Sequence, residues 1–185
     1  MSYAAVLEKA RQPQQQATAL VWRFDLPFAK GIWQVYASEK GLQAITLLDQ
    51  ASVEVAAPLE QSELPPKVAS WRRALVAYLA GEESAIERLP IDWQALSGTG
   101  FQKRCWLGLL SIPRGETRSY QWLAEQVGSP KAFRAVGQAN GSNPLPMVIP
   151  CHRVVGANGR LTGYMRGREG GVEVKAWLLA LEKNQ

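Results

Sequence analysis

Three short runs of β-branched and aromatic residues follow one another near the start of the chain. They cover Leu20 to Asp25, Gly31 to Ala37 and Leu42 to Leu48. Pro27 and the turn at residues 38–41 interrupt the pattern. Runs of this composition, bounded by turn residues, are typical of neighbouring strands. The sequence therefore predicts a small antiparallel sheet.

An amphipathic helix is predicted after this sheet. Pro65 and Pro66 open the pattern and Gly81 ends it, as proline and glycine commonly do at helix ends. The apolar positions between them recur at helical spacing: Val68, Trp71, Leu75, Tyr78 and Leu79. Residues 82–97 show no such period and are interpreted as a connector.

Helical spacing dominates the chain after residues 97–100. One helix carries Phe101, Cys105, Leu109 and Leu110 on a single face and stops at Pro113, and another runs from Val172 to Glu182. We expect two domains, at residues 1–96 and 97–185. The predicted fold class is α+β, with a sheet-plus-helix domain followed by a mainly helical one.

Two short helical patterns, Tyr120 to Val127 and Lys131 to Asn140, are separated by Gly128-Ser129-Pro130. This arrangement fits a helix-turn-helix, although many helical hairpins look alike. In the second helix, one face is expected to hold Ala132, Ala135, Val136 and Ala139, and the other Arg134, Gly137, Gln138 and Gly141. An interior glycine costs a helix about 1 kcal/mol relative to alanine. Tight packing in the core or insertion into a duplex groove would each explain the glycines.

Charge is unevenly divided along the 185 residues. Residues 1–100 carry nine Lys/Arg and eleven Asp/Glu, whereas residues 101–185 carry twelve and five, giving −2 and +7. Such asymmetry indicates a surface for a polyanion, with nucleic acid the leading candidate, or simply a solvated basic face.

Cysteine and histidine content limits the possible sites. Two cysteines, of which Cys105 is expected in the core, favour reduced thiols, and one histidine leaves too few ligands for a structural zinc. We expect no metal and no cofactor. No apolar run approaches the ~18 residues of a membrane span and Met1 to Gln16 is polar, so a soluble cytoplasmic monomer is expected.

The single histidine, His152, directly follows Cys151 in an apolar segment from Val148 to Val155. A cysteine reacts as thiolate, and because its free pKa is ~8.5 it needs a proton acceptor or a positive charge nearby. Pro150 stiffens the backbone before the thiol. These residues indicate a nucleophile in a rigid apolar cleft, although a buried cysteine beside an accidental histidine fits the segment too.

The motifs Gly115-Glu116-Thr117-Arg118-Ser119-Tyr120, Arg134-Ala135-Val136-Gly137, Asn143-Pro144 and Ile149-Pro150-Cys151-His152-Arg153-Val154 occur in that order. From about Phe101 to Glu182 the chain resembles the methylated-DNA-[protein]-cysteine methyltransferases, which repair O6-alkylguanine. The first hundred residues resemble that family only in general character. The resemblance implies a protein that docks on duplex DNA, everts the damaged base and moves one alkyl group from O6-alkylguanine, and from O4-alkylthymine, onto its own thiol.

The resemblance also implies roles for individual residues. Cys151 is the expected nucleophile, and His152 takes its proton through a water while Glu182 orients the imidazole. Tyr120 is expected to press on the phosphate of the everted nucleotide and Arg134 to fill the vacated place in the stack. Further DNA contacts are expected from Ser119, Ala135, Gly137 and Gln138, and pocket contacts from Asn143, Pro146, Tyr164 and Lys175.

Lys175 and Glu182 lie seven residues apart, hence on one face of the last helix, where solvated charges are the default expectation. The resemblance places the second helix of the pair in the minor groove, which suits its small residues. After Tyr164 the chain runs about four residues longer than the family pattern before reaching Gly170-Gly171, and the extra loop adds Arg166 and Arg168. We expect this loop to alter the tolerance for bulky adducts or to strengthen the grip on DNA.

Two other functions stay open. A cysteine acyl hydrolase uses the same residue types, but its histidine usually comes from a distant part of the sequence. Multiple turnover on a thioester or amide would identify such an enzyme. A non-catalytic DNA-lesion-binding or regulatory module would bind methylated duplex without gaining a methyl group on Cys151.

Overall fold

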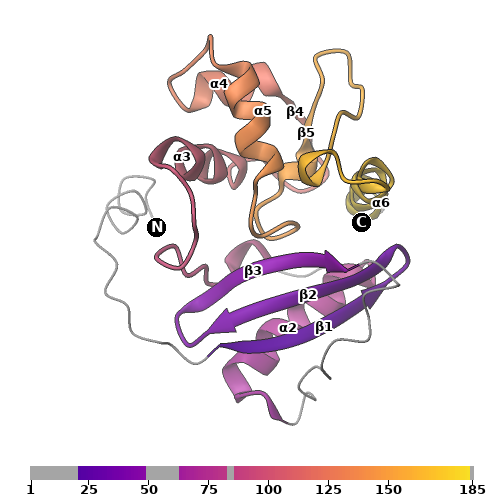
Figure 1. The fold of residues 1–185 in the computed structure, drawn as a ribbon. Helices are drawn as coiled ribbons and strands as arrows, with labels where there is room; N and C mark the ends of the chain where they lie inside the picture. Colours follow the sequence, from indigo (N-terminus) through magenta and orange to yellow (C-terminus); the bar gives the residue numbers. More distant parts are fainter. Residues whose placement is uncertain (1–20, 49–62, 83–85, 184–185) are drawn as a thin grey trace. The chain divides into compact units, whose positions relative to one another are not determined.

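The computed structural model describes residues 21–48, 63–82 and 86–183. The described residues fall into two compact units, with the division between Leu96 and Ser97. Figure 1 shows a unit built on a sheet and a unit built mainly of helices. The fold class is α+β.

The first unit is built on a three-stranded antiparallel sheet in the order β1-β2-β3. Its strands are β1 (Trp22–Phe28), β2 (Gly31–Ser38) and β3 (Gly41–Leu48). The predicted break at Pro27 is wrong, because Pro27 lies inside β1 and pairs with Ile32. A proline cannot donate to a strand ladder, but it is tolerated here because β1 is an edge strand. Leu20, the predicted start of the first strand, lies outside the described residues.

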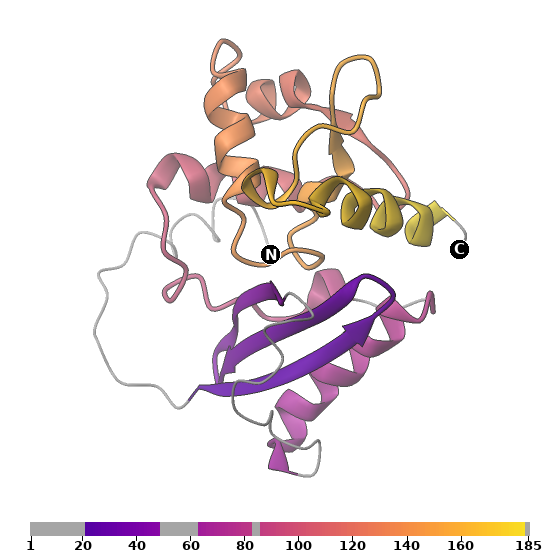
Figure 2. The same cartoon turned by 45° about the vertical axis from the view of Figure 1, so that its right-hand side comes forward.

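Helix α2 (Pro66–Leu79) packs on this sheet and contacts β1 (Figure 2). Val68, Trp71, Leu75 and Tyr78 are buried, as the apolar spacing predicted. The connector contains a 3₁₀ turn, η3 (Ile86–Arg88), and its Ile91 bridges to Leu42. Residues 86–96 therefore belong to the sheet-containing unit.

Among its described residues, the second unit holds four α-helices and a two-stranded parallel sheet. The elements are α3 (Gly100–Leu109), β4 (Arg118–Ser119), α4 (Tyr120–Gln126), α5 (Phe133–Gly141), η4 (Cys151–Arg153), β5 (Val154–Val155), η5 (Met165–Gly167) and α6 (Gly171–Lys183). Thr99 and Gln102 form a capping box that starts α3. Cys105, on the buried face of α3, is fully enclosed, and burial raises the pKa of its thiol to about 11.

Helices α4 and α5 form the helix-turn-helix that the sequence predicted, and both pack against α3. Ser119 begins α4 because its side chain accepts a hydrogen bond from the Trp122 N–H at 3.1 Å. One predicted face is partly wrong, since Val136, Ala139 and Asn140 are the buried residues of α5 and Ala135 is exposed. Within the described ranges, no helix is long and apolar enough to cross a membrane.

Candidate active site

Cys151 is the first residue of the 3₁₀ turn η4, and only 2% of its surface is exposed. Strand β5 begins only at Val154, after this turn. The chain reaches the turn through Met147, whose φ of 72° lies in the left-handed region, and through Pro150. Surrounding packing must hold such a backbone, and strained positions of this kind are frequent at functional sites.

Asn143 connects the approach segment to the thiol. Its Nδ2 donates to the Ile149 carbonyl at 2.7 Å and to Cys151 Sγ at 2.9 Å, while its Oδ1 accepts from the Leu145 N–H at 3.0 Å. Asn140 adds a second brace from α5, because its Nδ2 donates to the Cys151 carbonyl at 3.2 Å. The backbone and the sulfur of Cys151 are therefore both fixed by amide donors.

Burial raises the pKa of the Cys151 thiol above its ordinary value. Hydrogen bonds from Asn143 and Tyr164 and the charge of Lys175 act in the opposite direction but do not outweigh burial. The resting sulfur is thus a thiol, and it needs a proton acceptor before it can react.

His152 and Glu182 form a buried pair behind this turn. The imidazole Nε2 lies 2.8 Å from Glu182 Oε1, and both side chains are enclosed. Burial lowers the pKa of His152, so the ring is neutral at pH 7. Because an ionised carboxylate can only accept, Nε2 carries the proton and Nδ1 carries the lone pair. Nδ1 is buried and has no hydrogen-bond partner among the described residues.

Arg153 secures the carboxylate. Its Nε and Nη2 each donate to Glu182 at 2.8 Å, and its Nη1 donates to the Ile112 carbonyl at 2.7 Å. Burial alone would raise the pKa of Glu182, but the hydrogen bonds from His152 and Arg153 outweigh it and hold that pKa well below its usual range. Glu182 is therefore a carboxylate at any physiological pH.

Lys175 and Glu182 lie on α6 as predicted, but the default expectation of solvated charges is wrong, because both are buried. Lys175 Nζ donates to the carbonyls of Val154 at 2.7 Å and Thr162 at 3.1 Å. Burial lowers its pKa to about 8. Nζ also lies 5.9 Å from the ring centre of Tyr120, whose hydroxyl accepts from Thr162 Oγ1 at 3.2 Å. Tyr120 is thereby fixed close to the thiol, and burial raises its pKa.

Two other predicted pocket residues are enclosed near the thiol segment. Tyr164 is 1% exposed, and its side chain is among the groups that act to lower the pKa of the Cys151 thiol. Pro146 is buried in the segment that leads to the 3₁₀ turn. The structure therefore collects Tyr164, Asn143, Tyr120 and Lys175 around a single sulfur.

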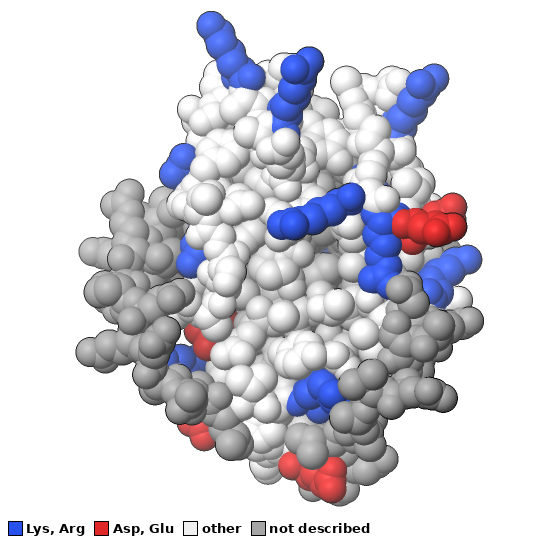
Figure 3. Space-filling model, viewed as in Figure 1, with Lys and Arg blue, Asp and Glu red and all other residues white. Residues whose placement is uncertain are grey.

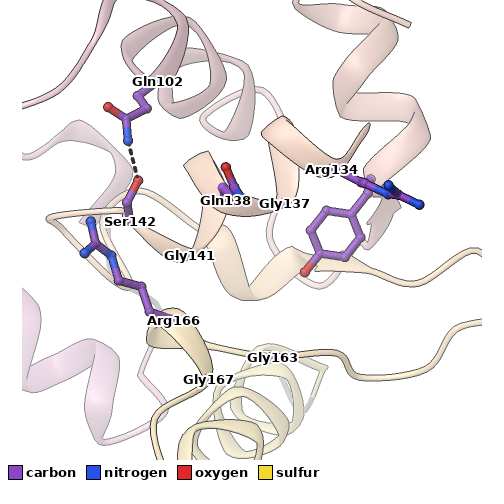
Figure 4. A pocket seen from close by; sticks show the side chains of 10 residues that line it. Gln102, Arg134, Gly137, Gln138, Gly141, Ser142, Gly163, Arg166 and Gly167 are labelled. Carbon is purple, nitrogen blue, oxygen red and sulfur yellow. Dashed lines mark hydrogen bonds between the residues drawn. The ribbon is translucent and has the colours of Figure 1, made fainter. Parts of the chain in front are cut away.

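A groove of about 790 Å³ lies along the exposed side of α5 (Figure 4). We call it the α5 groove, and its lining residues are Gln102, Tyr120, Arg134, Gly137, Gln138, Gly141, Ser142, Gly163, Arg166 and Gly167. Tyr120 belongs to this groove and also to the surroundings of the thiol. On the face in Figure 3, Lys and Arg side chains over the helical unit outnumber acidic ones. The lining itself holds two arginines and no carboxylate.

Glycine leaves the helix side of the α5 groove open. A Cβ placed on Gly137 would meet the Tyr120 ring only at 3.9 Å, an ordinary contact. Packing inside the protein therefore does not require glycine at this position. Of the two explanations for the glycines of this helix, approach by another molecule is the one that the structure favours.

Sequence reasoning assigned no role to Arg153, Asn140 or Thr162. Arg153 was visible in the Pro-Cys-His-Arg run, but its partner lies 29 residues away, and only the fold brings the two together. Asn140 and Thr162 act through backbone or hydroxyl contacts that leave no pattern in a single sequence. In the described part of the chain, no cluster of three His, Cys, Asp or Glu side chains could hold a metal ion.

Comparison with known proteins agrees with this geometry. Residues 100–184 match the family model for the DNA-binding domain of 6-O-methylguanine DNA methyltransferase. The chain is 52% identical over 111 residues to a methylated-DNA–protein-cysteine methyltransferase of Mycobacterium tuberculosis, an alignment that covers 60% of this chain and 62% of that relative. It is 40% identical over 147 residues to a protein of the same name from Methanosarcina barkeri, covering 80% and 87%.

Solved structures extend the similarity to three dimensions. The crystal structure of Mycobacterium tuberculosis OGT in complex with DNA superposes with a TM-score of 0.68 at 42% identity, covering 89% of this chain and 92% of that one. This similarity spans both units of the fold, and the Methanosarcina alignment spans four fifths of the sequence. The chain therefore belongs to the methylated-DNA–protein-cysteine methyltransferase family.

Proposed function

We propose that this protein repairs duplex DNA by moving the alkyl group of O6-alkylguanine, and of O4-alkylthymine, onto Cys151. The observation that carries the proposal is the set of groups around one sulfur. An amide donor is aimed at Sγ, and a buried neutral imidazole lies on the next residue with a carboxylate behind it. The α5 groove shares Tyr120 with this site, and its lining of two arginines and no carboxylate suits a polyanion such as DNA.

The transfer step balances with these groups. The proton of the Cys151 thiol moves through a bridging water to His152 Nδ1, the basic atom that has no hydrogen-bond partner in the described part of the chain. The sulfur then attacks the alkyl carbon, an S–C bond forms and the C–O6 bond breaks with its electron pair passing to the base. The base gains one proton, and the Tyr120 hydroxyl, which its raised pKa keeps protonated, is placed to donate it.

Eversion of the damaged nucleotide is part of the proposal. Cys151 is buried, so a base still stacked within a duplex cannot reach it. Everting a base costs a few kcal/mol, and least for a poorly paired lesion, which favours damaged positions. Arg134 is exposed near the start of α5 and is suited to occupy the vacated place in the stack. The small residues of α5 suit insertion into the minor groove.

The reaction ends after one event per molecule. A thioether on Cys151 has no leaving group that water can displace at neutral pH, and the only other cysteine, Cys105, is enclosed in the core and cannot accept the alkyl group in its place. We therefore propose a stoichiometric transfer. The Mycobacterium tuberculosis relative crystallised with DNA supports the choice of partner.

Intact-protein mass analysis tests the proposal. After incubation with a duplex that contains one O6-methylguanine, we expect a gain of one methyl group, confined to the Cys151 peptide and saturating at one equivalent. Cys151→Ser should gain nothing, while Cys105→Ser should behave as the wild type. Retained binding of the duplex with no mass gain would instead identify a lesion-binding module. Repeated turnover of a thioester substrate would identify an acyl hydrolase.

A further inference from the structure

The segment after Tyr164 forms a tight left-handed turn. Met165, Arg166 and Gly167 have φ values of 49°, 58° and 78°. Two of these residues are not glycine, and side chains rarely adopt this conformation unless the surroundings impose it. Hydrogen bonds from the N–H of Gly167 to the Tyr164 carbonyl at 3.0 Å and from the N–H of Arg168 to the Met165 carbonyl at 3.3 Å close the turn.

This turn rests on the carboxyl end of α5. Helix α5 and η5 are in contact, and a Cβ built on Gly141 would lie 3.5 Å from the Arg166 backbone nitrogen. The turn thus places the Arg166 side chain beside Gln102 and Ser142, at the end of the α5 groove away from Arg134 (Figure 4). The groove is lined by uncharged side chains at this end. Gln102 Nε2 donates to Ser142 Oγ at 3.0 Å, and the Ser142 hydroxyl donates to the Ala139 carbonyl at 3.0 Å.

The Arg166 guanidinium is left available. Its side chain is exposed, and within residues 21–48, 63–82 and 86–183 no hydrogen bond or ion pair engages it. Glu169 lies in the same loop but does not line the groove. The strained backbone thus holds the Arg166 guanidinium over a groove whose lining has no carboxylate. A guanidinium in such a place is suited to bind a phosphate group.

Spacing supports the same ligand. Arg134 and Gly141 are seven residues apart on α5, which corresponds to about 10 Å along the helix axis. Successive phosphates of one DNA strand advance by about 3.4 Å along the duplex axis, so a groove of this length has room for about three such steps. The surroundings of the sulfur are a different place, since Tyr164 and not Arg166 is among the groups that act on the Cys151 thiol.

We propose that Arg166 binds a backbone phosphate about three nucleotides from the position that Arg134 engages, so that the extra loop is a second anchor on duplex DNA. This inference rests on the proposed function for the identity of the ligand. Of the two roles expected for the loop, it selects the stronger grip on DNA and assigns no role in adduct size.

Binding of undamaged duplex at several salt concentrations tests this anchor. Arg166→Ala removes the guanidinium, and Arg166→Gly removes it while relaxing the left-handed backbone. Arg160→Ala is the matched control, because it removes the same charge from an exposed position outside the α5 groove. We expect both Arg166 variants to bind about five- to tenfold more weakly, with the log–log salt slope reduced by about 0.9, the value for one phosphate. Arg166→Lys should recover part of the affinity and the full slope.

Rates of methyl transfer distinguish a failure of the proposed Arg166 anchor from a failure of the proposed function. The Arg166 variants should transfer more slowly from dilute duplex but at the wild-type rate from free O6-methylguanine base. Unchanged salt slopes in both Arg166 variants, or equal losses in Arg160→Ala, would overturn the anchor. Equal slowing on duplex and free base would overturn it too, because Arg166 would then act at the sulfur. A wild-type chain that binds duplex but gains no methyl group would refute the proposed function alone.

Discussion

The side-chain amide of Asn143 divides its two hydrogens between the Ile149 carbonyl at 2.7 Å and Cys151 Sγ at 2.9 Å. Its oxygen meanwhile accepts from the Leu145 N–H. The amide cannot be turned over, because its oxygen would then face a carbonyl. The donor is thus aimed at the sulfur before any substrate arrives, and in the proposed transfer it would stabilise the charge that develops there.

Removing this donor should slow transfer. In Asn143→Ala we expect the pKa of Cys151 to rise further and methyl transfer to fall about ten- to hundredfold, because a hydrogen bond to a charged group contributes roughly 1.5–3 kcal/mol. Single-turnover rates and the pH dependence of thiol alkylation measure the two effects. Asn143→Asp is nearly isosteric, and it should be slower still, since it opposes the thiolate with a negative charge. An Asp variant as fast as the wild type would contradict the assignment.

The state of the Cys151–His152 pair predicts an unusual pH profile. The pKa of the thiol is raised and that of the imidazole is lowered, so both are neutral across a wide range. Transfer through the relay should therefore be nearly independent of pH from about 6.5 to about 7.5, where Lys175, with its pKa of about 8, still carries its charge. The rate should fall at lower pH as His152 gains a proton. A rate that climbs tenfold per pH unit across this range would mean that free thiolate reacts without the relay.

His152→Gln isolates the base. Glutamine can still donate to Glu182 but offers no basic nitrogen, so transfer should fall about 10²- to 10⁴-fold while duplex affinity stays as in the wild type. Electrophoretic or anisotropy titrations of the duplex would measure binding beside the rate. If affinity and rate fall together, His152 acts by supporting the fold rather than by accepting the proton.

Glu182 should make the fold sensitive to acid. Its folded pKa is depressed, so its stabilisation is complete above the ordinary glutamate pKa of ~4.3 and is lost as pH falls from there towards the folded pKa. At pH 7, Glu182→Gln should lower the free energy of unfolding by about 3 kcal/mol, since Arg153 is left buried without its partner charge.

Urea unfolding at pH 7 and pH 3 measures this contribution. The difference in the free energy of unfolding between the wild type and Glu182→Gln should be smaller at pH 3. Adding Arg153→Met to Glu182→Gln should restore part of the stability, because the unpaired charge is removed. If this difference in unfolding free energy is the same at both pH values, Glu182 contributes through packing alone.

Arg134 should matter only when a duplex must be opened. We expect Arg134→Ala to slow methyl transfer from duplex by at least tenfold and to leave the reaction with free O6-methylguanine base unchanged, because the free base has no stack to fill. Arg160→Ala again controls for loss of charge. Equal losses on both substrates would remove the intercalating role and leave Arg134 as a general phosphate contact.

The local pattern of residue types was sufficient to predict most of the helices and strands of this protein. Turn residues and spacing predicted the helices at α2, α3 and α6, the pair α4 and α5, and the three-stranded sheet, since these features depend on neighbours a few residues apart. The Pro-Cys-His-Arg run singled out Cys151 as the candidate nucleophile for the same reason. Pro27 was misjudged because whether a proline can lie in a strand depends on that strand being at the edge of its sheet.

The sequence by itself thus determined which helices and strands form and which of the two cysteines is the candidate nucleophile. The tertiary structure alone decided the electrostatics: it enclosed Glu182 with Arg153 and His152, brought Lys175 to two carbonyls, and turned Arg166 toward the α5 groove. The spacing of apolar and polar residues along the chain depends on near neighbours. The pKa of a side chain, and whether a charged side chain has a partner, depend instead on which distant groups the fold brings within a few ångströms and on how much water remains there.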